Sequence, residues 1–568
     1  MNNILFLILR RMRLPIIAVI VSYTIAVAGM SLMPGVDPDG QPWRLSIFEA
    51  FYVISYTATT IGFGEVPFPY STAQRMWMSF SIYLTVIPWF YAIGKIITLF
   101  QDPGLRQAFT TSRFAREVNH LMEPFYIVCG YGETGSLLVR ALDKNEVRVV
   151  VIELEQERIN ELELEDYQFD IPNLCADAKL PETLLRAGLK NPMCQGVAAL
   201  TNDDHANLAI AVAVKLISPE LRVLGRAETE QTASNMASFG TDHIINPYTI
   251  FGDHLAMEVH AIGTYLLHEW LTGVPGESLK SPICPPIGKW IVCGYGRFGR
   301  SVVQNLELEH ISTTIIEADP ERTGCKTCIV GNGTEKETLQ QAGVHEAVGI
   351  VAGTNDDINN LSIVMTAREM NPDLFVVLRK NKRFNAALFE HFKADITMEP
   401  SDIIAHECLA NMISPLLAQF LSLVRLQTNV WANSLIQRLV ETVGENVPET
   451  WAISITQENT PALFHMLAHE PVTLADILRN PNHREASLAI VPLMILRNHQ
   501  PLLLPEADTA LERGDRILFC GHDNAKSTTT YALSDFKTMR YMLHDQQLAD
   551  SWLWRQIKRR KSANNVRT

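Results

Sequence analysis

Seven consecutive residues near the N-terminus combine hydroxyl side chains with alternating glycines. They read Thr59-Thr60-Ile61-Gly62-Phe63-Gly64-Glu65. A backbone can turn successive carbonyl groups toward one axis only if alternate positions lack an obstructing side chain, which is the role of Gly62 and Gly64. Rings of such carbonyls replace the water shell of a dehydrated K⁺ ion. The segment therefore predicts cation coordination by the backbone of residues 60–63.

Two later segments carry the spacing Gly-x-Gly-x-x-Gly, each directly after an apolar run. They are Gly130-Tyr131-Gly132-Glu133-Thr134-Gly135 and Gly294-Tyr295-Gly296-Arg297-Phe298-Gly299. In such a turn the first glycine allows the bend, the second lets the backbone approach a phosphate, and the third packs the following helix on the strand. The amides at the N-terminus of that helix bind the anion. Both turns therefore predict a nucleotide phosphate site.

An acidic residue follows each turn at the distance typical of dinucleotide-binding folds. Glu153 follows the first turn and Glu317 the second. Either carboxylate would accept hydrogen bonds from a ribose diol and would repel a 2′-phosphate. The sequence therefore favours NAD⁺ or an adenosine phosphate such as ADP or ATP over NADP⁺.

The two turns belong to one unit that occurs twice. The aligned landmarks are Val149–Glu153 with Thr313–Glu317, Thr201-Asn202-Asp203-Asp204 with Thr354-Asn355-Asp356-Asp357, and Asn246-Pro247 with Glu399-Pro400. Agreement at several landmarks in the same order indicates an internal repeat. Short apolar runs alternating with amphipathic stretches predict buried parallel strands joined by crossover helices. Each copy is therefore predicted to be a doubly wound Rossmann unit.

The second copy is expected to be the better nucleotide site. Glu133 places negative charge where a phosphate would lie in the first copy, whereas Arg297 and Arg300 would neutralise a phosphate in the second. The alternative for the first copy is a Rossmann fold that keeps the turn and binds nothing. The predicted nucleotide-binding residues are Gly294, Gly296, Arg297, Phe298, Gly299, Arg300, Glu317, Asn332, Thr354 and Asn355, with Gly130, Gly132, Glu133, Thr134, Gly135, Glu153, Asp177, Thr201 and Asn202.

Two uncharged segments in the first hundred residues are long enough to cross a membrane. They are Leu14–Met33 and Met76–Ile93, and a bilayer core of about 30 Å needs about 20 apolar residues. Leu45–Ala58 is too short to cross and is predicted to be a re-entrant helix that leads into residues 59–65. Arginines precede the first span, at positions 10, 11 and 13, and follow the second span, at positions 106, 113 and 116. The positive-inside rule therefore predicts that both termini are cytoplasmic.

Composition narrows the possible partners. The formal charge of −14 argues against a nucleic acid, which requires a basic face. Nine scattered cysteines are typical of reduced thiols in the cytosol. The sequence contains no Ser nucleophile elbow, Walker A loop or His-Glu-x-x-His motif.

Taken with the paired Gly-Tyr-Gly turns, the Thr59–Glu65 segment resembles the selectivity filter of two-transmembrane prokaryotic potassium channels gated by RCK (TrkA-N) domains, in particular the tandem-RCK, multi-ligand-gated type. The resemblance implies a helical membrane pore followed by two α/β Rossmann-like RCK domains. It also implies a homotetramer in the inner membrane that conducts K⁺, is not an enzyme, and senses adenine nucleotides and in some members Ca²⁺. The implied regions are a pore (1–100), a linker (101–123), a first RCK domain whose C-lobe is largely missing (124–273), a linker (274–287), the second RCK N-lobe with its crossover helix (288–424), its C-lobe (425–545) and a basic tail (546–568).

The chain departs from the family pattern in the pore. Phe63 replaces the usual tyrosine, so the hydroxyl contact behind the filter is expected to be absent. The short pore helix carries Tyr52 and Tyr56 instead of a tryptophan pair. Pro88 lies where relatives have a glycine hinge, before Gly94. Because proline removes a helix hydrogen bond, we expect the inner helix to break near Pro88 and to gate there and at Gly94.

Two other functions are compatible with parts of the sequence. A membrane-tethered NAD-dependent oxidoreductase would account for the Rossmann turns but not for residues 59–65. A regulatory subunit of a separate K⁺ transporter would not need a filter.

Two clusters of titratable residues have alternative readings. The acidic residues between Glu155 and Asp170 form either a solvated helix face or Ca²⁺ ligands. His254, His260 and His268 are expected on one helix, Ile250–Leu271, without the spacing of a zinc pair, and are interpreted as packing or capping residues.

Overall fold

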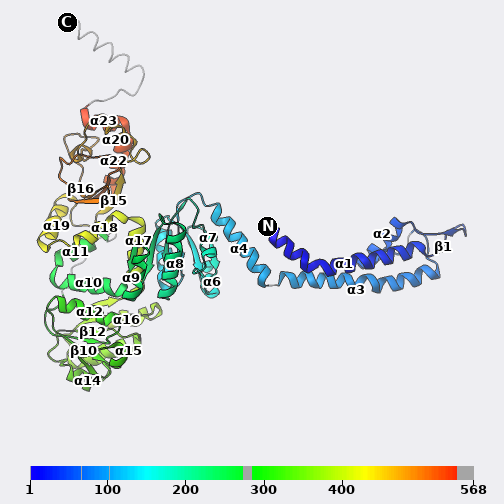
Figure 1. Cartoon of the computed structure of the whole chain (residues 1–568), viewed down its shortest axis with the longest axis horizontal. Coiled ribbons are helices and arrows are strands. Elements are labelled where there is room, and N and C mark those ends of the chain that lie inside the picture. Colours follow the sequence, from blue (N-terminus) through cyan, green and yellow to red (C-terminus); the bar gives the residue numbers. More distant parts are fainter. Residues whose placement is uncertain (1, 66, 102, 273–284, 546–568) are drawn as a thin grey trace, which may run out of the picture. The chain divides into compact units, whose positions relative to one another are not determined.

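The computed structural model describes residues 2–65, 67–101, 103–272 and 285–545. The chain divides into two compact units (Figure 1). One contains residues 1–122 with two short pieces, 172–174 and 186–188, and the other contains the remainder. Each unit is described by itself.

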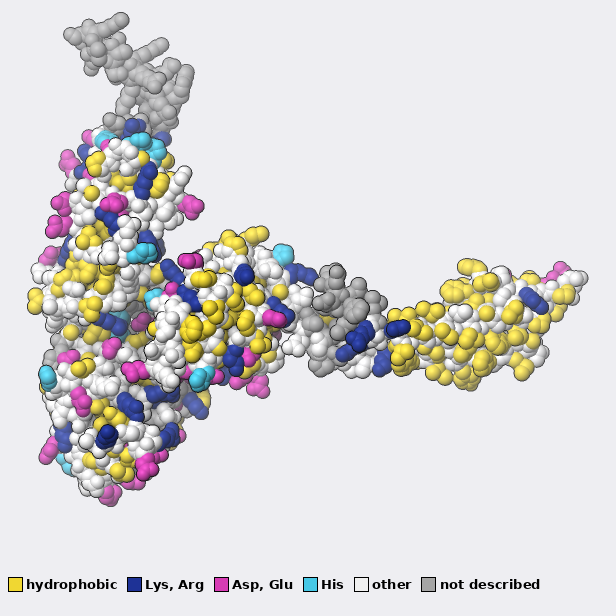
Figure 2. All heavy atoms as spheres, in the orientation of Figure 1, with side chains coloured by type: hydrophobic (Ala, Val, Ile, Leu, Met, Phe, Trp, Pro, Cys, Tyr) yellow, Lys and Arg dark blue, Asp and Glu magenta, His cyan; other side chains and the backbone are white. Residues whose placement is uncertain are grey.

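The N-terminal unit is built from helices. α1 (Asn2–Leu32) and α3 (Thr72–Phe100) each contain a described stretch long and apolar enough to cross a membrane, Arg10–Leu32 and Thr72–Leu99. α2 (Ile47–Ala58) lies between them, after the short strands β1 (Gly35–Val36) and β2 (Pro42–Trp43), and α4 (Pro103–Asn119) follows α3. Figure 2 shows an almost continuous hydrophobic surface over the long helices. Side chains this apolar and this exposed need lipid or another protein surface to cover them.

The short helix α2 begins at a capping box. Ser46 Oγ accepts a hydrogen bond from Glu49 N, and Glu49 Oε2 accepts one from Ser46 N. Both amides would otherwise be unpaired at the helix start. The predicted short helix over Leu45–Ala58 is therefore present, beginning two residues later than expected.

The expected break at Pro88 is wrong. α3 runs unbroken from Thr72 to Phe100 with Pro88 inside it. Proline removes one hydrogen bond from a helix interior, and the turns on either side suffice to keep this helix continuous. Within the single subunit, Pro88 therefore does not end the helix.

The first Rossmann unit is a six-stranded parallel sheet in the order β5-β4-β3-β6-β7-β8. Its elements are β3 (Phe125–Cys129), α5 (Glu133–Lys144), β4 (Arg148–Glu153), α6 (Gln156–Leu164), β5 (Asn173–Cys175), α7 (Pro181–Arg186), β6 (Cys194–Ala199), α8 (Asp204–Ile217), β7 (Arg222–Arg226), α9 (Glu230–Ser238) and β8 (His243–Ile245). The central strand β3 is buried along its whole length. The strand order reverses beside β3, which is where such folds bind nucleotides.

The second unit repeats this topology in the order β11-β10-β9-β12-β13-β14. Its elements are β9 (Trp290–Cys293), α12 (Arg297–Leu308), β10 (Thr313–Glu317), α13 (Pro320–Thr323), β11 (Cys328–Val330), α14 (Lys336–Gln341), β12 (Gly349–Ala352), α15 (Asp357–Met370), β13 (Phe375–Arg379), a 3-10 turn (Arg383–Asn385), α16 (Ala386–Phe392) and β14 (Ile396–Met398). The predicted duplication of a doubly wound sheet is confirmed.

Two helices follow each parallel sheet. They are α10 (Pro247–His260) and α11 (Ile262–Thr272) after the first, and α17 (Pro400–Ile413) and α18 (Pro415–Val424) after the second. The single helix expected over Ile250–Leu271 is wrong, because the chain turns at Ala261, whose φ of −127° and ψ of 51° are not helical.

Among the described residues, a smaller lobe follows the second unit and not the first. It has a four-stranded antiparallel sheet in the order β15-β18-β16-β17. Its elements are α19 (Asn429–Val443), β15 (Glu449–Ser454), α20 (Pro461–Met466), α21 (Leu474–Ile477), β16 (Ile490–Arg497), β17 (Gln500–Leu503), β18 (Arg516–Gly521), α22 (Asp523–Ser534) and α23 (Phe536–His544). The expected basic tail, and the linker up to residue 284, lie outside the described residues.

Candidate functional site

The Thr59–Glu65 segment follows the C-terminus of α2 and is exposed. The amides of Ile61 and Gly62 both donate to Tyr56 O, at 2.9 and 3.3 Å. Thr60, Gly62 and Gly64 have φ values of 62°, 65° and 96°, so alternate residues lie in the left-handed region. This conformation is open to glycine and costs a threonine of order 1–2 kcal/mol. Alternating the backbone hand is what turns successive carbonyls to the same side, as a coordinating ring requires.

An aromatic cluster from α2 supports this segment. The Tyr56 hydroxyl donates a hydrogen bond to the carbonyl of Gly64. The Phe63 ring stacks on Tyr52, with ring centroids 6.5 Å apart, and meets Tyr56 edge-on at 5.6 Å. Phe63 has no hydroxyl to contribute, as expected from the sequence. The hydroxyl contact with this segment comes from Tyr56 of α2 instead.

The end of the segment is held by an ion pair. Arg75 Nε and Nη2 donate to the two carboxylate oxygens of Glu65 at 2.8 and 3.0 Å, and Tyr70 N donates to Oε2 at 2.8 Å. The Arg75 hydrogen bond, the Tyr70 amide and the Arg75 charge outweigh partial desolvation and lower the pKa of Glu65. Glu65 is thus a fixed negative charge beside the last glycine.

Replacing Tyr56 with phenylalanine should destabilise the Thr59–Glu65 segment by about 1 kcal/mol in each chain, the net value of one hydrogen bond. We expect a lower permeability ratio of K⁺ to Na⁺ in flux assays of the variant. Tyr52→Phe is the matched control because it keeps the ring stacked on Phe63. Equal permeability ratios for the two variants would show that the Tyr56 hydroxyl has no such role.

Both glycine turns have the geometry of a phosphate site. Gly130 and Gly294 have φ values of 100° and 94°. A Cβ on Gly135 would lie 2.0 Å from Gly130 O, and one on Gly299 would lie 1.9 Å from Gly294 O, so the third glycine lets helix and strand touch. The N-caps of α5 and α12 are glycines that make no side-chain cap hydrogen bond. The first amides of both helices therefore lack a side-chain cap of the kind that would compete with an anion.

The two predicted ribose-binding acids lie at these turns. Glu153 Oε2 accepts a hydrogen bond from Tyr131 N at 2.5 Å, and Glu317 Oε2 accepts one from Tyr295 N at 2.6 Å. Each carboxylate thus braces the turn that it follows by about twenty residues, a role the spacing alone did not reveal. Both sit at the carboxyl end of the strand next to the turn, where a ribose would lie.

The charges around the turns differ from those expected from the sequence. In the first copy, Glu133 Oε1 accepts a hydrogen bond from Arg383 N at 3.2 Å. A Cβ on Gly132 would lie 3.5 Å from Arg158 Nη1, so an arginine borders this turn. In the second copy, Arg297 Nη2 pairs with Glu228 Oε2 at 2.7 Å, and Arg300 lies over the Tyr295 ring. The argument that ranked the second copy first is weakened, because both turns have an arginine beside them and the charge of Arg297 is already paired.

The two Thr-Asn-Asp-Asp segments form equivalent turns beside the glycine loops. The amide and hydroxyl of Thr201 donate to Asn207 Oδ1, both at 2.8 Å, and Thr354 is bound in the same way by Asn360. Asn207 and Asn360 are completely buried, and sequence reasoning missed both. The signal was available, since each occupies the same place after its threonine in the two copies.

Three further predicted nucleotide residues make local contacts. Asn202 Oδ1 accepts a hydrogen bond from Arg226 Nη1 at 2.9 Å. Asp177 pairs with Lys179, and Asn332 donates to Glu335. Asp177, Asn202 and Asn332 follow the carboxyl ends of β5, β6 and β11. Asn202 also borders the first glycine turn, because its Nδ2 would lie 3.9 Å from a Cβ on Gly132.

The first helix after each parallel sheet packs on the helix that begins at the glycine turn of the other sheet. Tyr248 and Phe251 of α10 share a buried cluster with Phe298 and Val302 of α12. In the same way, Ile404 and Cys408 of α17 pack with the buried face of α5. The helix that begins at each glycine turn is therefore in direct contact with a helix of the other Rossmann unit.

An ion cluster lies in the first of these contacts. Glu228 contacts Arg226, Arg297 Nη2 and the Tyr248 hydroxyl, which also accepts from Arg379 Nη2 at 3.1 Å. Burial alone would raise the pKa of Glu228, but the charges of Arg226 and Arg297 with hydrogen bonds from Arg226 and Tyr248 lower it. The first residue of α12 is thereby tied to the first Rossmann unit.

Glu228→Gln should destabilise the folded protein by about 3 kcal/mol at neutral pH, because it leaves the largely buried Arg226 without its carboxylate partner. A carboxyl group with a lowered folded pKa stabilises above its unfolded pKa and loses this effect as pH falls through its folded pKa. The difference in thermal unfolding between wild type and variant should therefore shrink in acid. Glu230→Gln, at an exposed position, should change stability by less than about 1 kcal/mol. A pH-independent difference would contradict the ion-pair explanation.

The two Rossmann units match one known family. Residues 126–247 and 290–400 match the TrkA-N domain. The chain is 24% identical over 212 residues to potassium channel protein 1 of Methanocaldococcus jannaschii, covering 37% of this chain and 61% of that protein. It is 25% identical to the voltage-gated potassium channel Kch of Escherichia coli, covering 38% of this chain and 49% of that protein. The chain thus spans less than two thirds of either relative.

Two solved structures are similar to this chain over most of its length at low sequence identity. The GsuK channel bound to NAD is 14% identical, with a TM-score of 0.47, over 94% of this chain and 99% of that chain. GsuK bound to ADP is 18% identical, with a TM-score of 0.44, over 72% of this chain and 98% of that chain. Two segments in tandem after two apolar helices thus match the TrkA-N domain, and the chain is similar in part to potassium channels.

Proposed function

We propose that the chain is one subunit of a K⁺-selective channel whose conduction is controlled by an adenine nucleotide. The observation that carries the proposal is the filter segment, residues 59–64, with its alternating left-handed backbone between two apolar helices. Backbone carbonyls of residues 60–63 would coordinate K⁺. One chain supplies one strand of such a ring, so the channel would be a homotetramer in a cell membrane.

The orientation follows from charge. Arg10, Arg11 and Arg13 lie at the start of the first span, and Arg113 and Arg116 on α4 beyond the second. Both termini and the TrkA-N domains would therefore be cytoplasmic.

The regulatory ligand would bind at the glycine turns. Helix amides would hold its phosphates, and Glu153 or Glu317 its ribose, which favours NAD⁺, ADP or ATP. The packing of α10 on α12 supports transmission, because a ligand that changes the turn acts on a helix of the other domain. Such a ligand shifts conduction only by the difference in its affinity for the open and closed states. Ca²⁺ would be a second ligand, bound by carboxylates.

The proposal is tested by K⁺ flux into liposomes that contain the purified full-length protein. K⁺ uptake should exceed Na⁺ uptake and should change when NAD⁺, ADP or ATP is added outside. Nucleotide binding without any flux would point to a regulatory subunit of a separate transporter. Turnover of NAD⁺ would point to an oxidoreductase.

A further inference from the structure

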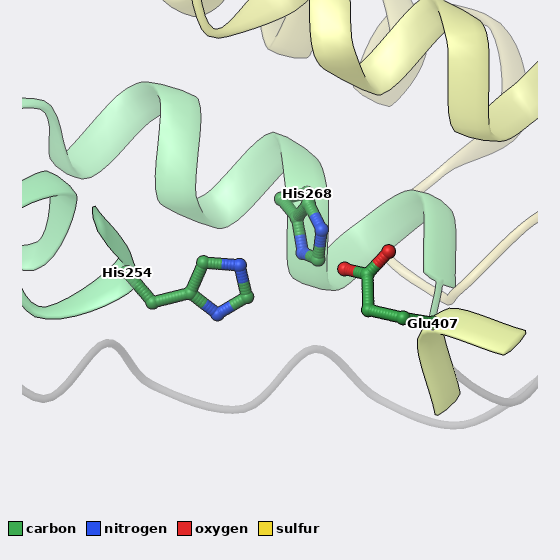
Figure 3. A group of neighbouring side chains, drawn as sticks. All are labelled: His254, His268 and Glu407. Carbon is green, nitrogen blue, oxygen red and sulfur yellow. The ribbon is translucent and has the colours of Figure 1, made fainter. Parts of the chain in front are cut away.

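Two histidines and a glutamate from three helices meet beside the crossover helices. His254 lies on α10, His268 on α11 and Glu407 on α17 (Figure 3). One ligand atom of each lies within 4.8 Å of those of the other two. The two imidazole ring centroids are 4.8 Å apart. Among the described residues, the acidic stretch from Glu155 to Asp170 contains no comparable group.

The duplication explains why these side chains meet. α10 and α17 begin at the equivalent residues Pro247 and Pro400, and His254 and Glu407 occupy equivalent positions on the two helices. The helices pack together, so the equivalent positions face each other. The turn at Ala261 then brings His268 back to His254. A continuous helix would have kept the two histidines apart, which is why their spacing gave no zinc motif.

The electrostatics leave lone pairs available for an ion. Burial lowers the pKa of His254 to about 4, and burial with the nearby His254 and Arg425 lowers the pKa of His268 well below its usual value. His268 Nδ1 is buried and has no hydrogen-bond partner in the described part of the chain. His254 Nε2 lies 3.1 Å from Arg425 Nη2, and because arginine only donates, this nitrogen carries a lone pair.

We propose that His254, His268 and Glu407 bind one transition-metal dication of the Zn²⁺ class. Two imidazoles and a carboxylate, with water in the fourth position, are a known donor set for Zn²⁺. Tetrahedral bonds of about 2.0–2.1 Å would place ligand atoms about 3.4 Å apart, so the side chains must close by rotation. Imidazole ligands favour Zn²⁺ or Co²⁺ over Ca²⁺ and Mg²⁺.

The positive charge of Arg425 opposes binding of a cation, so a variant at Arg425 serves as a control. The metal would replace Arg425 at His254, and the arginine would keep Asp253, whose Oδ2 lies 3.9 Å from its Nη1. Its positive charge lowers metal affinity. Removing that charge should therefore tighten binding, whereas removing a ligand should weaken it. A bound ion would tie α10 and α11 to α17 and so restrict the contact between the two TrkA-N domains.

The experiment uses purified, metal-stripped full-length protein. Zn²⁺ affinity is measured by competition with a chromophoric chelator, and Co²⁺ serves as a spectroscopic probe of imidazole ligation. We expect one ion per chain and no displacement by millimolar Ca²⁺ or Mg²⁺. Glu407→Gln and His268→Gln should each lower Zn²⁺ affinity by about 10-fold or more. Arg425→Gln should raise it, and His205→Gln, at an exposed position, should leave it unchanged.

Tight binding that survives both Glu407→Gln and His268→Gln would overturn the proposal, as would binding no tighter than that of Ca²⁺. Glu407→Gln keeps the shape of the side chain, so it remains informative if His268→Gln does not fold. The readout is metal affinity, which is independent of ion conduction. Failure of this site therefore leaves the proposed channel function untouched, and failure of conduction leaves the site untouched.

Discussion

Alanine at Gly62 is expected to abolish K⁺-selective flux. Gly62 has a φ of 65°, and an L-residue in this region costs about 1–2 kcal/mol, which would apply to every subunit of the proposed tetramer. The side chain itself meets nothing within 4 Å in the subunit, so the expected loss comes from the backbone. The measurement is K⁺ uptake into liposomes at equal protein density.

Gly40→Ala is the matched control for Gly62→Ala. Gly40 also has a positive φ, 77°, and also has open space around its Cβ position, but it lies in the turn between β1 and β2. The same local strain there should leave conduction intact. If both variants conduct K⁺ with unchanged selectivity, residues 59–64 are not the filter.

Aspartate at Gly296 is expected to remove nucleotide binding from the second TrkA-N domain while K⁺ conduction persists. A Cβ at Gly296 meets nothing within 4 Å, so the variant should fold, but its carboxylate would repel phosphate at the N-terminus of α12. Gly299→Ala would be a poor test, because its Cβ would collide with Gly294 O. Binding is measured by titration calorimetry of the full-length protein with NAD⁺, ADP and ATP.

Gly132→Asp makes the same change in the first domain. There the new carboxylate would lie beside Arg158, so repulsion of phosphate should be smaller. Loss of binding in Gly132→Asp but not in Gly296→Asp would identify the first domain as the sensor. Unchanged binding in both variants would contradict phosphate binding at the glycine turns.

Much of the fold follows from local patterns. Two uncharged runs of sufficient length predicted the two long helices. Apolar runs, two of them followed by a glycine turn, predicted both parallel sheets. These signals depend on residues close together in the chain. The turn at Ala261 and the unbroken helix through Pro88 were missed, because tertiary packing rather than local propensity decides where such helices bend or end.

The site was predictable where one segment forms it and not where several do. Residues 59–65 and the six-residue turns are contiguous. Other contacts at the site join side chains from different elements. They are the Tyr56 hydroxyl on Gly64, Arg158 beside Gly132, and Arg297 paired with Glu228. The residue types can be read from the sequence, but the contacts between them cannot. The same is true of His254 and Glu407, which lie on different domains of the repeat.

A planar bilayer recording of the purified full-length protein addresses conduction and control together. With K⁺ on one side and Na⁺ on the other, the reversal potential should lie close to that of a K⁺-selective pore, and open probability should change when NAD⁺, ADP or ATP reaches the cytoplasmic face. That change should vanish in the glycine-turn variant that fails to bind. No K⁺-selective current in the presence of any of these nucleotides would contradict a nucleotide-controlled K⁺ channel.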